Sequence, residues 1–236
     1  MAQSSIGISK CGGEVSVDHS KNITIKGFLF TNLLRLVSKT WRVHIEGKVF
    51  LDQYYETGKP CFIGFWHGKY IPIFPLLEGY EACVITSLST RGNIIGEICK
   101  SFGYKNAQIP DEPRLDAFRQ LLHELKAVQV YGTSLDGPLG PYHQTKHGLI
   151  RLSGMLGSDL LPVTVYNSRH LTASKRWDKL EIPLPFSRLC VIFGDPISIP
   201  SHVTRIELQT LSERIGHELD ELQIQAKTAL WRKKHA

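Results

Sequence analysis

Two short segments combine chemically active side chains with glycine or proline, and each follows an apolar run. The first is Trp-His-Gly-Lys at residues 66–69, and the second is Ser-Leu-Asp-Gly-Pro-Leu-Gly-Pro at residues 134–141. A neutral imidazole is an effective general base near pH 7, because its unperturbed pKa is about 6.5. Gly68 leaves the adjacent backbone open to a substrate. We therefore take His67 as the candidate base; the alternative is a histidine that only hydrogen-bonds a neighbouring loop.

The second segment holds a carboxylate in a stiff turn. Asp136 is followed by two Gly-Pro pairs, which restrict the backbone and add little side-chain bulk. Such a turn can hold the carboxylate where it would orient His67 or contact a polar head group. The alternative is an Asx turn or a helix cap, a common role for Asp in this setting.

Other chemistries lack their motifs. The chain has no GxSxG, GxxxxGK[ST] or GxGxxG. His143 and His147 are four residues apart but lack an HExxH setting and a third ligand at a suitable spacing, so we expect neither a metal nor a cofactor. Basic residues are not clustered, and no nucleic-acid-binding motif is present, so we expect no nucleic acid partner. The five cysteines are widely spread without a CxxC pair, which suits a reducing compartment.

Apolar runs alternate with helical patterns from residue 60 onward. We expect strands at residues 61–66, 82–87, 127–133, 160–166 and 189–194, and helices at 93–102, after Asp111, from Lys146 and over 204–230. This order predicts an α/β fold with a mostly parallel sheet covered by helices on both faces. Chemistry in such folds gathers beyond the carboxyl ends of the strands, so both loops should face one crevice.

The chain of 236 residues is expected to form one α/β domain at 27–236 after a flexible arm at 1–26. Residues 28–43 predict an amphipathic helix. One side carries Phe30, Leu33, Leu34, Val37 and Trp41.

That helix could pack on the core or lie in a membrane interface, and both are possible on different faces. The net charge of +6 fits an anionic partner such as a lipid surface or an acidic carrier protein. No apolar stretch approaches the roughly 18 residues of a membrane span, and the N-terminus lacks a signal-peptide core. We therefore expect a cytoplasmic protein, peripheral to the inner face of the membrane if the helix binds lipid.

Taken together, four segments resemble the lysophospholipid acyltransferase superfamily, which includes glycerophosphate and lipid A acyltransferases. They are FWHGKYIPIFPLL, DGPLGPYHQTKHG, LLPVTVYNSR and VIFGDPISIP, in the order and spacing of a bacterial branch catalogued as a domain of unknown function. The upstream LLRLVSKTWRVHIEG resembles the lead-in helix of that branch. The resemblance covers residues from about 30 to 200.

The resemblance implies transfer of a fatty acyl group from a thioester of coenzyme A or acyl carrier protein to a hydroxyl of a lipid-like acceptor. In the superfamily, the His of an HxxxxD motif is the base and the Asp orients it. His67 matches that His, but position 72 is Pro72 and the next acidic residue is Glu78. We therefore expect Asp136 to orient the imidazole in place of the missing carboxylate.

The same resemblance assigns the remaining site residues. Backbone N–H groups near Gly68 or Gly137 would steady the oxyanion. Four basic side chains would bind an anionic head group or the phosphates of the donor: Lys69, Arg91, Arg114 and Lys146. The alternative function is a non-catalytic, peripheral membrane protein that binds lipid on the same fold. The oligomeric state is left open by the sequence.

Overall fold

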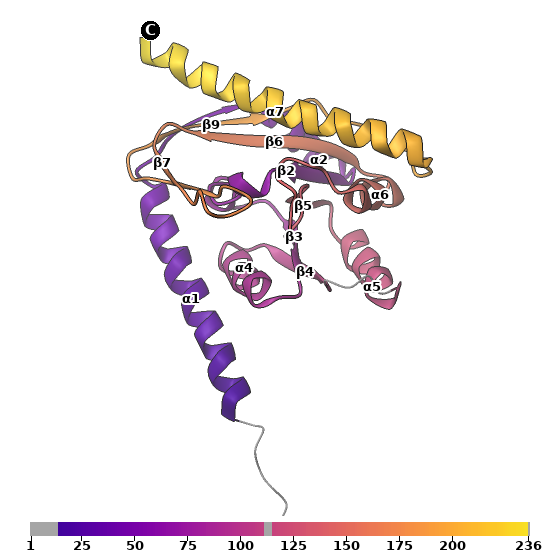
Figure 1. Ribbon diagram of the computed structural model, residues 1–236, viewed down its shortest axis with the longest axis horizontal. Helices are drawn as coiled ribbons and strands as arrows, with labels where there is room; N and C mark the ends of the chain where they lie inside the picture. The colour runs from indigo at the N-terminus through magenta and orange to yellow at the C-terminus, as the bar shows by residue number, and fades with distance from the viewer. Residues whose placement is uncertain (1–13, 111–114, 236) are drawn as a thin grey trace, which may run out of the picture.

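The strands of the computed structural model, which describes residues 14–110 and 115–235, form one seven-stranded sheet and one two-stranded sheet (Figure 1). The order in the large sheet is β1-β9-β6-β2-β5-β3-β4. All neighbouring pairs are parallel except β6 with β9. The predicted α/β class with a mostly parallel sheet is therefore confirmed. The strands are β1 (Arg42–Glu46), β2 (Cys61–Phe65), β3 (Ala82–Ser87), β4 (Lys105–Ile109), β5 (Val130–Ser134), β6 (Asp159–Asn167), β7 (His170–Thr172), β8 (Glu181–Pro183) and β9 (Arg188–Phe193).

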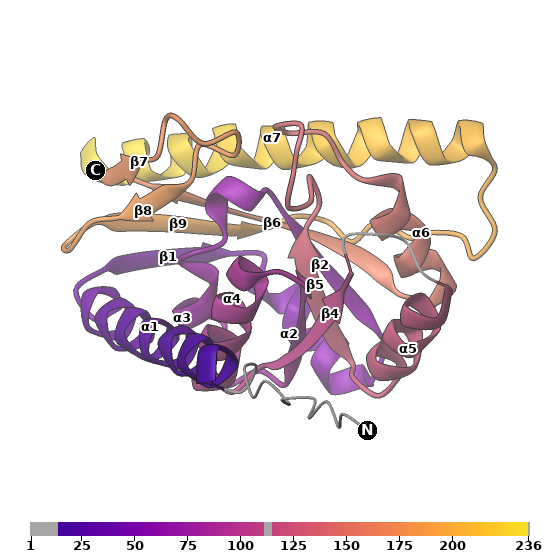
Figure 2. The same cartoon turned by 60° about the horizontal axis from the view of Figure 1, so that its bottom comes forward.

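Helices cover both faces of the large sheet (Figure 2). One face carries apolar residues of α1 to α4 and the other those of α5 to α7. The helices are α1 (Glu14–Ser38), α2 (Lys48–Thr57), the 3₁₀ turn η1 (His67–Lys69), α3 (Ile73–Leu76), α4 (Thr90–Ser101), α5 (Leu115–Lys126), α6 (His147–Met155) and α7 (Arg205–His235).

The alternation of side chains along β2 shows why this strand is apolar throughout. Ile63 packs among the residues of α1 to α4, whereas Phe62 packs on the opposite face. Since successive side chains of a strand point to opposite faces, a strand covered on both sides needs apolar residues at every position. All five residues of β2 are buried, and the strand delivers His67 directly beyond its carboxyl end.

The N-terminal helix differs from the sequence prediction at both ends. It begins at Glu14, so residues 14–26, expected to be part of a flexible arm, are helical, and residues 1–13 lie outside the described chain. It ends at Ser38, and residues 42 and 43 belong to β1, because strand pairing with β9 replaces the expected last helical turn. Leu34 is buried on the core, but Leu33, expected on the same side, is 59% exposed.

The sequence patterns located most of the sheet but missed its edges. The five predicted strands correspond to β2, β3, β5, β6 and β9. The two outer strands, β1 and β4, have partly exposed and polar positions, so they lack the continuous apolar run of a central strand. The β7–β8 hairpin was also missed, because each of its strands has only three residues.

Candidate active site

The strands β2 and β5 are parallel neighbours, and the two chemically active loops meet beyond their carboxyl ends. The backbone N–H of His67 donates a hydrogen bond to Asp136 Oδ1 at 2.9 Å. The prediction that these loops share one edge of the sheet is therefore confirmed. The His67 side chain is 21% exposed, so its ring is largely enclosed but still reaches solvent.

The carboxylate that contacts the imidazole belongs to Asp178, not to Asp136. His67 Nδ1 lies 2.7 Å from Asp178 Oδ2. Asp178 lies in the loop between β7 and β8 and is completely buried. With the Nδ1 proton directed at this carboxylate, the lone pair of the ring is on Nε2, as a general base requires. The expectation that Asp136 orients the ring is wrong, because its carboxylate is used by the backbone N–H of the same histidine.

Arg176 completes a chain of three charged or polar side chains. Its Nε and Nη2 atoms donate to the two oxygens of Asp178 at 2.9 and 2.6 Å. Burial by itself raises the pKa of Asp178, but the Arg176 guanidinium and the His67 ring outweigh it and hold the pKa below its ordinary value. Asp178 is thus a carboxylate near neutral pH, fixed by a bidentate partner on one side and facing the imidazole on the other.

The pKa of His67 is lowered by burial, and the Asp178 carboxylate partly opposes that shift. The net direction keeps the ring neutral at pH 7. Two aromatic rings lie beside the imidazole, those of Tyr70 and Trp177, with centroids 5.2 and 5.3 Å from that of His67. A neutral histidine with an oriented Nδ1 proton, partly open to solvent, has the properties of a general base.

The loop that carries Asp178 packs closely against the loop of His67 and the loop of Asp136. A Cβ on Gly68 would lie 2.4 Å from the carbonyl oxygen of Asp178. A Cβ on Gly140 would lie 2.6 Å from an indole carbon of Trp177. These two positions therefore need glycine, because any side chain would push the hairpin away from His67. Gly68 is itself buried, so glycine at this position serves close packing against the hairpin. The backbone access to a substrate that was expected from the sequence is not observed there.

Asp136 links the two loops through its hydrogen bond with the backbone of His67. It is completely buried, and its Oδ2 has no hydrogen-bond partner among the described residues. Burial raises its pKa to about 6, although backbone N–H groups, including that of His67, act in the opposite direction. Asp136 is thus a positioning residue for the backbone of His67.

Three of the predicted binding residues already have partners within the protein. The Lys69 ammonium binds Glu181, and that of Lys146 donates to the carbonyl of Gly140. The Gly137 N–H donates to the carbonyl of Ser134 at 3.2 Å, so it is not placed as an oxyanion donor.

The other basic candidates differ in what the structure says of them. Arg91 is exposed in the first turn of α4, and its charge acts on the pKa of Tyr70, which borders the His67 ring. Arg114 lies outside the described residues. The sequence signal for Arg176 and Asp178 was weak, because a Lys-Arg-Trp-Asp-Lys run in a loop is typical of a solvated surface.

A second histidine, His143, lies next to the site and pairs with a different carboxylate, that of Asp220. The ring of His143 stacks on Trp66 with centroids 4.6 Å apart, and its Nδ1 lies 2.7 Å from Asp220 Oδ1 of α7. The Trp66 Nε1–H donates to the same oxygen at 2.9 Å. These contacts fasten the loop after β5 to α7 directly beside His67.

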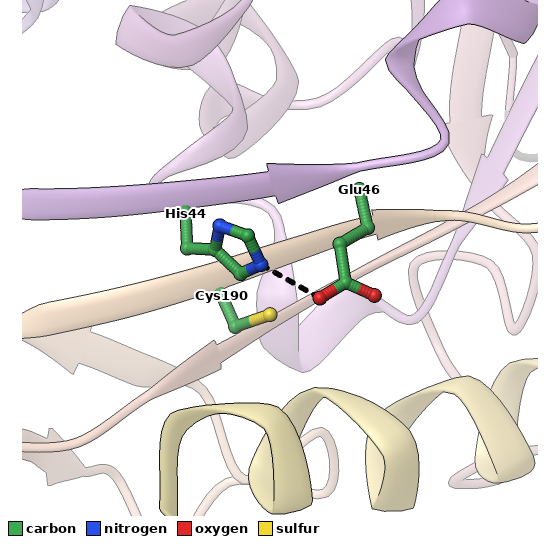
Figure 3. Close-up of side chains that lie close together, drawn as sticks. All are labelled: His44, Glu46 and Cys190. Atoms are coloured by element: carbon green, nitrogen blue, oxygen red, sulfur yellow. Dashed lines mark hydrogen bonds and ion pairs between the residues drawn. The ribbon is translucent and has the colours of Figure 1, made fainter. Parts of the chain in front are cut away.

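One further group of side chains has atoms that could ligate a metal, among the residues that the structure describes. His44 and Glu46 of β1 and Cys190 of β9 have potential ligand atoms within 4.8 Å of one another (Figure 3). His44 Nε2 lies 2.6 Å from Glu46 Oε1, and Cys190 packs in the apolar layer under α7. Because β9 and β6 separate β1 from β2 in the sheet, this group is not part of the His67 site.

Comparison with known proteins places the fold. No family model matches the chain. An uncharacterized protein of Rickettsia prowazekii (strain Madrid E) is 25% identical over 137 residues, which are 57% of this chain and 62% of that protein, so the match spans less than two thirds of the relative. The crystal structure of the 1-acyl-sn-glycerophosphate (LPA) acyltransferase PlsC from Thermotoga maritima is similar with a TM-score of 0.52 and 16% identity, over 90% of this chain and 84% of that one. The chain therefore has an acyltransferase-like fold.

The first prediction concerns the buried charge of Asp136. Because its pKa is raised from 3.8 to about 6, the folded state holds this proton more tightly, and stability falls as pH rises between these values. Asp136→Asn keeps an acceptor for the His67 N–H and removes the titration. We expect the free energy of unfolding of this variant, relative to the native chain, to increase by about 2 kcal/mol from pH 4 to pH 7 in urea titrations. A constant difference would show that the carboxyl titrates normally.

The second prediction concerns the Asp178 carboxylate. Its negative charge stabilises the imidazolium form of His67, so Asp178→Asn should lower the pKa of the ring further, by about one to three pH units. The measurement is an NMR titration of the ring signals. Asp195→Asn, an exposed carboxyl elsewhere, is the matched control and should leave the titration unchanged. An unshifted His67 in Asp178→Asn would contradict the observed pair.

Proposed function

We propose that the protein is an acyltransferase that moves a fatty acyl group from an acyl thioester to a hydroxyl of a lysophospholipid or another lipid-like acceptor. The observation that carries the proposal is the chain of contacts from Arg176 through Asp178 to the Nδ1 of His67. The acyltransferase-like fold supports it, since the similar PlsC structure is named as an acyltransferase acting on 1-acyl-sn-glycerophosphate. Donor and acceptor are inferred from this likeness and from the sequence resemblance.

The reaction needs one base and no covalent enzyme intermediate. His67 Nε2 removes the proton from the acceptor hydroxyl while that oxygen attacks the thioester carbonyl. The tetrahedral intermediate then expels the thiolate, which takes the proton back from the imidazolium. The products are an ester and a thiol. Asp178 stabilises the imidazolium during this cycle, and Arg176 keeps the carboxylate charged and aligned.

Cysteine chemistry fits the site poorly. The four described cysteines are Cys61, Cys83, Cys99 and Cys190, and all are buried. Burial raises the pKa of Cys83 to about 11 and that of Cys61 to about 12. Thiols with such pKa values are poor nucleophiles, so a direct attack by the acceptor is favoured over an acyl-cysteine.

We further propose that the protein is peripheral to the inner face of the cytoplasmic membrane and binds it through α1. Five large apolar side chains of this helix are more than half exposed: Ile25, Phe28, Leu29, Leu33 and Leu36. From residue 22 to its end, α1 holds Lys26 and Arg35 and no acidic residue, and Arg35 pairs with Glu78. Lys39 and Arg42 follow directly after the helix, so this end of it suits an anionic lipid surface. None of the described helices is long and apolar enough to cross a membrane.

The alternative is a lipid-binding protein without catalysis. Enclosure of His67, the contact of Lys69 with Glu181 and that of Lys146 with the Gly140 carbonyl fit a structural role for these residues. Orientation of the ring by a buried, ionised carboxylate favours catalysis, because structural packing alone does not need it. An activity assay separates the two functions.

The third prediction tests the base. His67→Ala should lower the rate of acyl transfer by about 10²–10⁴-fold. The assay uses purified protein, labelled acyl-coenzyme A and acyl carrier protein as donors, and a lipid extract whose products are identified. His44→Ala is the matched control, because this histidine lies at the sheet edge and pairs with Glu46. Full activity of His67→Ala would refute the assignment.

The pH dependence of the acyl-transfer rate should agree with the assignment of His67 as the base. The rate of the native chain should fall as pH drops through the pKa of His67, which lies below 6.5, because protonation removes the base. Asp136→Asn should retain this limb, which separates the titration of His67 from that of the neighbouring carboxyl.

The fourth prediction tests α1. The double variant Leu29→Gln, Leu33→Gln should bind anionic vesicles more weakly, on the order of a hundredfold, in co-sedimentation. The reason is that the native chain gains free energy by moving these two exposed leucines from water into the lipid. The fold should be retained, since both side chains are exposed. Asn32→Gln, on the same exposed stretch, is the control. Val37 is unsuitable for this test because it packs against the core. Equal vesicle binding by the double variant would exclude this surface.

A further inference from the structure

The β7–β8 hairpin has an apolar outer surface. Leu171 and Ile182 face each other in register across the two strands and are 59% and 40% exposed. Phe186, in the turn after β8, is 73% exposed. Large apolar side chains are unfavourable in water, so this exposed pair, followed by Phe186 in the same segment, indicates a surface that contacts something apolar.

The charges of the hairpin favour a lipid surface as that contact. Residues 169–188 hold five basic and two acidic residues. Both acidic side chains are turned inward: Asp178 binds His67 and Arg176, and Glu181 binds Lys69. Three basic residues of the segment are exposed, namely Arg169, Lys175 and Lys179, and the ammonium of Lys179 lies over the Tyr142 ring. An apolar surface flanked by exposed cations is complementary to an anionic bilayer.

The hairpin is also continuous with the proposed membrane surface of α1. The Trp41 Nε1–H donates to the carbonyl of Leu184 at 3.1 Å, and the Phe186 N–H donates to Thr40 Oγ1 at 2.9 Å. These bonds join the end of the hairpin to the chain directly after α1. The hairpin and the C-terminal end of α1 accordingly lie at the same end of the molecule (Figure 1).

The same hairpin carries the partners of His67. Its loop contains Arg176, Trp177 and Asp178, whereas its strands pair only with each other and form a separate two-stranded sheet. Their contacts with the large sheet are made by side chains, such as the hydrogen bond that Asn167 of β6 donates to Glu181 of β8 at 3.2 Å. A two-stranded hairpin is only marginally stable by itself. The position of Asp178 against His67 therefore depends on what holds the hairpin in place.

We propose that an anionic lipid bilayer binds the outer surface of the β7–β8 hairpin and, by holding the hairpin against the fold, holds Asp178 against His67. The membrane is then an activator of the site as well as an anchor. This inference rests on the proposed function. A bilayer that binds only the seated hairpin shifts the population toward the arrangement in which His67 is oriented.

The first experiment measures contact without using activity. Amide hydrogen exchange of the full chain is followed with vesicles of phosphatidylcholine alone and with vesicles that contain phosphatidylglycerol. The anionic vesicles should slow exchange in residues 170–183 and in α1. In a Leu171→Gln, Ile182→Thr variant, protection of the hairpin should be lost while that of α1 remains. Thr172→Gln, an exposed change on the same strand, should behave as the native chain.

The second experiment measures activation. Transfer to an acceptor in anionic vesicles is compared with transfer to a soluble, short-chain acceptor. Withdrawing two partly exposed aliphatic side chains from water can favour the seated hairpin by a factor on the order of ten, so the native chain should be stimulated about tenfold. The Leu171→Gln, Ile182→Thr variant should lose this stimulation but keep the native rate on the soluble acceptor and still bind vesicles through α1.

The outcomes separate this proposal from the proposed function. Equal stimulation of the variant and the native chain, or no protection of residues 170–183, overturns the proposal and leaves the acyltransferase function standing. Protection by acyl carrier protein but not by vesicles also overturns it, because the surface is then a protein-binding site. If the native chain transfers no acyl group in any arm, the proposed function fails and activation fails with it, while hydrogen exchange still decides whether the hairpin contacts lipid.

Discussion

The hydrogen bond between His67 and Asp178 is the interaction on which the site depends. It joins two parts of the chain that are 111 residues apart, one at the end of a central strand and the other in a separate hairpin. Without the carboxylate, the pKa of the ring would fall further, and the ring would lose the partner that selects its tautomer. The strand β2 gives the imidazole of His67 a rigid position, and the hairpin gives it its orientation.

Two buried carboxylates therefore have different roles around His67. Asp136 binds the backbone N–H and stabilises the position of the loop, while Asp178 binds the ring. Their environments push their pKa values in opposite directions. Burial dominates at Asp136 and raises its pKa to about 6, whereas at Asp178 burial is outweighed by Arg176 and His67 together, which lower the pKa. The bidentate guanidinium at only one of them explains why Asp178, the carboxylate that faces the imidazole, keeps its charge to lower pH than Asp136 does.

The arrangement of surfaces relates the chemistry to its proposed location. The exposed apolar residues of α1 and of the hairpin are linked through Trp41 and Phe186, and the hairpin loop reaches His67. A lipid acceptor would then meet the site at the surface where its own chains lie. The long helix α7 covers the other face of the sheet and fastens the second loop through Asp220.

The sequence by itself determined the class of fold and indicated His67 as the candidate base. Apolar runs such as residues 61–66 predict central strands, because burial on both faces requires apolar residues at consecutive positions. His67 and Asp136 follow two such strands, so their proximity could be expected from the geometry of parallel sheets. Three features could not be expected in this way: the edge strands, the true length of α1 and the exposure of Leu33. They depend on pairing and packing with distant residues. Only the tertiary structure decided which carboxylate faces the ring: an Asp in a polar hairpin loop carries no local signal, and its role exists only because folding brings it, with Arg176, against a residue far away in the chain.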